Sequence, residues 1–81
     1  MTAKRFSRWL EEELGRRRLR VRQLAANLDV NYSSVGNWVR GQRLPSEENC
    51  IKMANYFQMD PARILELAGY GAERPTEGAK P

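Results

Sequence analysis

With 81 residues, the chain has room for one domain and no second hydrophobic core. Its single cysteine excludes an intramolecular disulfide and multi-cysteine metal sites, and the absence of histidine excludes a histidine-based triad or metal site. The net charge of +4 is unevenly distributed, because residues 1–45 carry ten basic groups against four acidic ones, whereas residues 46–81 carry four against six. A basic half joined to a slightly acidic half is typical of a protein that meets a polyanion with one face.

The first predicted element is a helix over about Lys4–Arg17. Its apolar residues recur at the spacing of one helical face: Phe6, Trp9, Leu10 and Leu14. We expect both tryptophans of the chain, Trp9 and Trp38, to belong to the core. The acidic triplet Glu11–Glu13 lies in the middle of this helix, and we expect it to face solvent.

A two-turn helix is predicted next, from an apolar stripe made of Val21, Leu24, Ala25 and Leu28. Arg20 occupies its N-cap position but has no oxygen to offer, which costs about 1 kcal/mol relative to Ser or Thr. Asp29 tolerates the left-handed conformation that a short connection needs, and Asn31 is a good N-cap. A third helix, Tyr32–Arg40, then ends at the expected C′ glycine, Gly41.

Two short helices joined by a turn of three to four residues, the second with a polar outer face, are typical of a helix-turn-helix. Here that unit spans about Leu19 to Val39. The polar face of its second helix consists of Tyr32, Ser33, Ser34 and Asn37, with Asn31 at its start. Small hydroxyls and amides match base edges in a DNA major groove, and asparagine in particular can pair bidentately with adenine. The pattern therefore predicts a DNA-binding helix.

Gly36 costs about 1 kcal/mol inside this third helix, which suggests that another group approaches closely there.

A fourth helix is predicted to begin after the cap Ser46 and a fifth after Asp60, with Pro61 at its first position, running to Ala68. The fourth helix has a wide apolar face, consisting of Cys50, Ile51, Met53, Ala54, Tyr56 and Phe57. The fifth has more apolar residues than one small core can bury. We therefore expect a leftover apolar strip that serves as a dimer surface, made of Ile64, Leu67 and Tyr70.

The boundaries that follow are a domain at residues 1–69 and a flexible tail or truncated linker at residues 70–81. No apolar run approaches membrane-spanning length, and Met1–Lys4 does not lead into a signal-peptide core. We expect a cytoplasmic protein without cofactors. Enzymatic activity is not expected, because no histidine, metal cluster or phosphate-binding glycine loop is present.

The chain also resembles the Xre/Cro-like (lambda-repressor-like) helix-turn-helix regulators over about residues 5–69. The residues that carry the resemblance are Leu24-Ala25, Val35, Trp38-x-Arg40-Gly41 and Leu44-Pro45-Ser46, all in register. The resemblance implies a compact, all-α, five-helix domain with its third helix in the major groove. It also implies base contacts from Tyr32, Ser33 and Asn37. Two positions depart from the family pattern. Where the family usually has a polar group at the start of the second helix, this chain has Val21, and where it has a Ser/Thr cap, this chain has Arg20.

Because of these departures, we expect Arg20, Arg22 and Gln23 to take over contacts with the DNA backbone. The full set of expected backbone contacts is Arg18, Arg20, Arg22, Gln23, Asn31, Ser34, Arg40 and Arg43.

The resulting hypothesis is a transcriptional regulator, a repressor, that binds a near-palindromic DNA operator as a homodimer with half-sites about 34 Å apart. An alternative from another functional class stays open at this point. An antitoxin or adaptor module would use the same fold to bind a partner protein.

Overall fold

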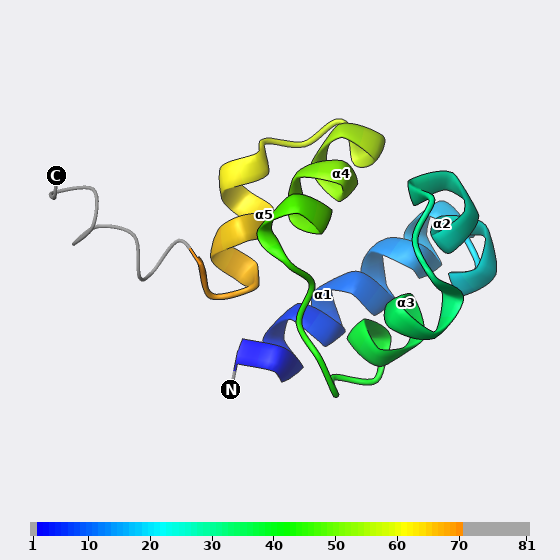
Figure 1. Ribbon diagram of the computed structural model, residues 1–81, viewed down its shortest axis with the longest axis horizontal. Coiled ribbons are helices and arrows are strands. Elements are labelled where there is room, and N and C mark those ends of the chain that lie inside the picture. Colours follow the sequence, from blue (N-terminus) through cyan, green and yellow to red (C-terminus); the bar gives the residue numbers. More distant parts are fainter. Residues whose placement is uncertain (1, 71–81) are drawn as a thin grey trace, which may run out of the picture.

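The computed structural model describes residues 2–70, which form five α-helices and no strand (Figure 1). The helices are α1 (Thr2–Arg17), α2 (Val21–Leu28), α3 (Tyr32–Val39), α4 (Glu47–Phe57) and α5 (Pro61–Leu67). The all-α, five-helix prediction is confirmed, and the helix ends differ from those expected by two residues or fewer. Residues 71–81, most of the proposed tail, lie outside the described residues.

The long helix α1 runs through the middle of the molecule, with α2 near its C-terminal end and α3 alongside it, so that the end of α3 reaches Ser7 near the start of α1 (Figure 1). All five helices contribute to one core, whose buried members are Phe6, Leu10, Leu14, Leu24, Ala25, Leu28, Val35, Trp38, Cys50, Met53, Ala54, Phe57, Ile64 and Ala68. Trp9 is half-buried against this core, and its ring centroid lies 5.6 Å from that of Phe6 and 6.1 Å from that of Phe57. Both tryptophans are therefore core residues, as predicted.

The predicted helix caps are present. The side chains of Asn31, Ser46 and Asp60 accept hydrogen bonds from the backbone N–H groups two or three residues further on, at 3.1–3.3 Å. Gly41 follows α3 in the left-handed region, with φ 76°. These local interactions set where α3, α4 and α5 begin and where α3 ends.

The apolar face predicted for α4 was too wide. Ile51 is 43% exposed and Tyr56 is 38% exposed, so neither belongs to the buried face. Residues spaced three and four apart, such as Cys50, Met53 and Phe57, occupy the single stripe that the other helices cover. Tyr56 instead lies at the surface, where its hydroxyl accepts a 2.8 Å hydrogen bond from the Asn27 side chain.

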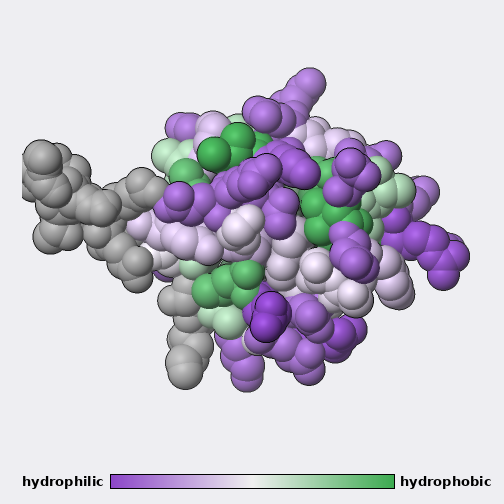
Figure 2. All heavy atoms as spheres, viewed as in Figure 1, coloured by the Kyte–Doolittle hydropathy of each residue, from purple (hydrophilic) through white to green (hydrophobic). Residues whose placement is uncertain are grey.

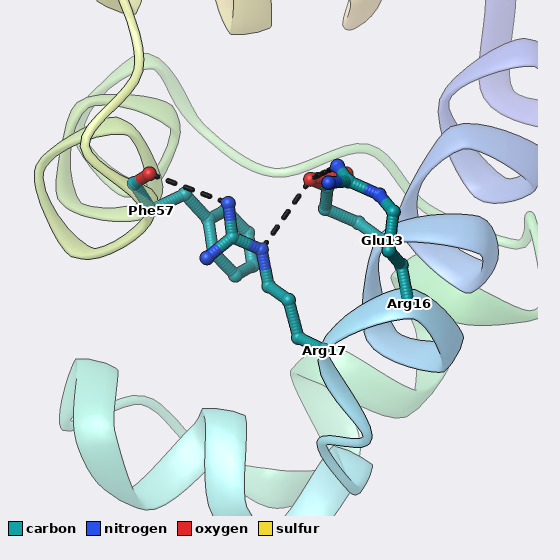
Figure 3. Close-up of polar contacts among 4 residues, drawn as sticks. All are labelled: Glu13, Arg16, Arg17 and Phe57. Carbon is teal, nitrogen blue, oxygen red and sulfur yellow. Dashed lines mark hydrogen bonds and ion pairs between the residues drawn. The ribbon is translucent and has the colours of Figure 1, made fainter.

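The expectation that the whole acidic triplet of α1 faces solvent was wrong at Glu13, which is only 3% exposed. Its carboxylate pairs with Arg16 and Arg17 of the following turn (Figure 3). Arg17 also donates to the backbone carbonyl of Phe57 at 3.4 Å, and its guanidinium lies 4.5 Å from the centre of the Phe57 ring. Arg17 therefore joins the end of α1 to the end of α4.

The single cysteine is a core residue. Cys50 is fully buried, and this burial, together with the nearby Glu47 carboxylate, raises the pKa of its thiol to about 12. A thiol that stays protonated at neutral pH is a poor nucleophile, so Cys50 acts in packing.

The two arginines paired with Glu13 should differ in their effect on stability. Arg17→Ala removes an ion pair, a carbonyl hydrogen bond and a cation–π contact, and should lower the free energy of unfolding by roughly 1–2 kcal/mol. Arg16→Ala removes only a pair whose arginine side chain is 67% exposed, and should cost less than about 0.5 kcal/mol. Urea denaturation measures both values. Equal losses would contradict the role given to Arg17.

Candidate nucleic-acid interface

A tight three-residue turn connects α2 to α3 and sets their relative orientation. Asp29 adopts the left-handed conformation with φ 60°, as expected, and the Val30 N–H donates to the Ala25 carbonyl at 2.9 Å. Asn31 then caps α3, and its side-chain oxygen also accepts a 3.1 Å hydrogen bond from the Ser33 hydroxyl. The result is two short, packed helices with the geometry of a helix-turn-helix.

Helix α3 buries its apolar side and exposes its polar one. Val35 and Trp38 are inside, at 0% and 3% exposure, whereas Tyr32 is 58% exposed. Ser33 and Asn31 are also exposed, and the two remaining polar residues, Ser34 and Asn37, are half-buried. The five polar residues expected at the DNA surface therefore all come from one helix and its cap.

The start of α2 lies next to the start of α3. A shallow surface hollow is lined by Arg20, Val21, Arg22, Gln23 and Tyr32, which brings a base-contact candidate together with three backbone-contact candidates. The Arg20 side chain supplies no cap, as expected, but the Gln23 side chain accepts the Arg20 N–H at 2.9 Å. The sequence analysis missed this bond, although a glutamine three residues after the N-cap is a known capping signal.

The other end of α3 carries two exposed arginines, Arg40 at its C-cap and Arg43 in the following loop. Arg40 donates a 2.9 Å hydrogen bond to the side-chain oxygen of Asn37. A Cβ atom at Gly36 would lie 3.1 Å from the same guanidinium, so the group that approaches Gly36 is Arg40. The sequence analysis missed this pairing, which the i, i+3 spacing of Asn37 and Arg40 could have indicated.

Arg18 closes α1 in a conformation that is unusual for arginine. Its φ is 54°, in the left-handed region, and the Leu19 N–H donates to the Leu14 carbonyl at 2.8 Å, as in a Schellman motif. Glycine is the usual residue at such a position, because a side chain there costs roughly 1–2 kcal/mol. The chain therefore keeps an exposed cation beside the helix-turn-helix at a cost in stability.

The proposed dimer strip is only partly at the surface. Ile64 is fully buried, so its assignment to a dimer surface was wrong, and it serves instead as the main core contact of α5. Leu67 is half-buried and lines a hollow with residues of α1. Tyr70 packs against the core, and its hydroxyl donates to the Pro45 carbonyl at 2.9 Å. Tyr70 is thus joined to the folded domain.

Hydrophilic side chains cover most of the face shown in Figure 2, and the hydrophobic ones form only separated patches. Within residues 2–70, no group of three or more acidic or cysteine side chains is placed to hold a metal ion. None of the helices in this range is long and apolar enough to cross a membrane.

Comparison with protein families gives one match. The family model described as "Helix-turn-helix" covers residues 10–64, which is more than half of the chain. The chain belongs to the Xre/lambda-repressor-like helix-turn-helix family. Domains of this helix-turn-helix family bind double-stranded DNA and are typical of transcriptional regulators. Searches of curated proteins and of solved structures found no significant match.

The left-handed conformation of Arg18 leads to a test on stability. Arg18→Gly should raise the free energy of unfolding by about 0.5–1 kcal/mol, because it removes the steric cost of a Cβ at positive φ, less the entropy cost of glycine. Arg18→Ala is the matched control, since it removes the same charge but keeps the Cβ. Denaturant titration compares the two variants, and an Arg18→Gly protein no more stable than Arg18→Ala would refute this explanation.

Proposed function

We propose that this helix-turn-helix domain is the sequence-specific DNA-binding unit of a transcriptional repressor, with α3 in the major groove. The observation that supports this best is the arrangement of charge around α3. Arg20 and Arg22 lie with Tyr32 at its first turn, and Arg40 and Arg43 lie at its last. The major groove is about 12 Å wide and admits one helix. With α3 in the groove, cations at both of its ends are within reach of the phosphates that flank the groove.

Within this proposal, the side chains have two kinds of role. Tyr32, Ser33 and Asn37 contact base edges. Phosphate contacts come from the residues around them, all of them exposed except the half-buried Ser34: Arg18, Arg20, Arg22, Gln23, Asn31, Ser34, Arg40 and Arg43. Gln23 suits this role because its side-chain oxygen is held by the Arg20 N–H, which leaves its amide donors for a phosphate oxygen.

The proposed unit on DNA is a symmetric dimer. One helix of this length spans only a few base pairs, so two copies on a near-palindromic operator, about 34 Å apart, would supply the remaining specificity. With Ile64 inside the core, the apolar surface left for dimerisation on α5 is centred on Leu67. A polar α3 flanked by arginines favours DNA over a partner protein as its main ligand, because its hydroxyl and amide groups match base edges and the arginines match phosphates.

The test of this function is selection of bound duplexes from a random pool, followed by titration of the selected site at several salt concentrations. The proposal expects a palindromic consensus with half-sites separated by one helical turn. Enrichment of no sequence would contradict specific binding.

Arg22 should contribute through charge alone. Arg22→Ala should weaken binding to all duplexes alike and lower the slope of log K against log salt by about one unit, because one fewer counterion is released. Arg63→Ala is the matched control, since Arg63 is also exposed but lies on α5, outside the helix-turn-helix. An unchanged slope for Arg22→Ala, or an equal change for Arg63→Ala, would rule out the phosphate contact.

Asn37 should contribute to sequence preference. Asn37→Ala should relax the preference at one or two base pairs and cost roughly 1–3 kcal/mol on the selected site, with little effect on unrelated duplexes. Competition binding with single-substituted duplexes measures this change. Full discrimination by the variant at every position would show that Asn37 makes no base contact.

A further inference from the structure

The side-chain amide of Asn37 has a defined orientation on the outer face of α3. Its oxygen accepts a hydrogen bond from Nη2 of Arg40 at 2.9 Å. Because a guanidinium group has five N–H donors and no acceptor, only the amide oxygen can face it. The Nδ2 group of Asn37 must therefore point away from Arg40, with both of its hydrogens free to bind another acceptor.

Gly36 provides the space for this pairing. It lies one turn before Arg40 on the same side of α3, and a Cβ atom there would lie only 3.1 Å from Nη1 of Arg40. Gly36 itself is buried although it is on the polar side of the helix. The Arg40 guanidinium therefore lies close over the helix at Gly36, next to Asn37.

The pairing changes which base edge the helix can match. Asparagine alone pairs bidentately with adenine, for which its oxygen must accept from the adenine N6 amine while its amide donates to N7. Here the oxygen is shared with a cationic donor, which would stand beside the N6 amine, itself a donor. Guanine presents two acceptors, N7 and O6, in the major groove. The free hydrogens of Asn37 and Arg40 complement those two acceptors.

We propose that Asn37 and Arg40 act as one donor-only unit that selects guanine over adenine at the base pair facing the second half of α3. This proposal rests on the proposed function and specifies the base that the site prefers. Arg40 then has a role in specificity, in addition to its charge.

The test is competition binding of the full chain to duplexes that differ only at the base pair where Asn37→Ala loses discrimination. The unaltered protein should prefer guanine to adenine there by roughly tenfold or more. Arg40→Ala, which frees the Asn37 oxygen, should lose this preference and shift it toward adenine. Arg43→Ala is the matched control, because it removes a neighbouring exposed charge but keeps both the Arg40 bond to the Asn37 side chain and the Arg43 backbone bond to the Asn37 carbonyl. Arg43→Ala should weaken binding to all duplexes equally and keep the preference for guanine.

Arg40→Met serves as a second variant that keeps most of the apolar stem of the side chain but has no donor, and it should lose the guanine preference as well. Circular dichroism is the check that both variants fold. A measurement that needs no DNA is the chemical shift of the two NMR signals of the Asn37 side-chain amide. These signals should shift in Arg40→Ala and stay in place in Arg43→Ala.

The outcomes separate the two claims. If the unaltered protein binds a specific site but prefers adenine there, or if Arg40→Ala still prefers guanine, the donor-only unit is wrong and the proposed function stands. An Asn37 amide signal that does not respond to Arg40→Ala also overturns the unit. If the unaltered protein binds no duplex even at low salt, the proposed function is wrong, and the base preference with it.

Discussion

The burial of one side of α3 is the constraint on which the proposed DNA-binding surface depends. Val35 and Trp38 are held in the core, and an eight-residue helix anchored at two positions one turn apart cannot rotate about its axis. The opposite side, which carries Tyr32, Ser33 and Asn37, must then face outward. The capped turn before α3 and the left-handed Gly41 after it set where the helix begins and ends.

The arginines of the chain divide into structural and surface groups, which the net charge does not reveal. Arg17 makes contacts within the protein, because it binds Glu13 and the carbonyl of Phe57 and so joins the end of α1 to α4 (Figure 3). Arg18, one residue later, is exposed and strained, which a stabilising role would not require. These two neighbouring arginines should therefore have opposite effects on stability, and the strained Arg18 belongs with the group proposed to meet DNA.

Much of the fold could be predicted from sequence because it is determined locally. The caps Asn31 and Asp60, the left-handed Asp29 and the stop at Gly41 each depend on residues within one turn. The polar side of α3 could be predicted because Val35 and Trp38 are spaced three apart on the apolar side of the helix. The predictions that failed depend on contacts between distant segments.

Ile64 was misplaced because α5 has several apolar residues, and only the packing of the helices decides which one is buried. Glu13 was misplaced because its partner Arg17 also contacts Phe57 of α4, which is distant in sequence. The orientation of the Asn37 amide was missed for a different reason, because the contact is local but depends on the rotamer that Arg40 adopts over Gly36. Spacing shows that such a pair is within reach, but only the three-dimensional structure shows that the bond forms.

The most direct test of the outward-facing α3 is an NMR titration of the labelled protein with duplex DNA at low ionic strength. The account predicts that the largest shifts occur at the backbone amides of Ser33, Gly36 and Asn37, with smaller ones at Arg20 and Arg22. Shifts confined to α4 and α5, with α3 unaffected at saturation, would contradict it.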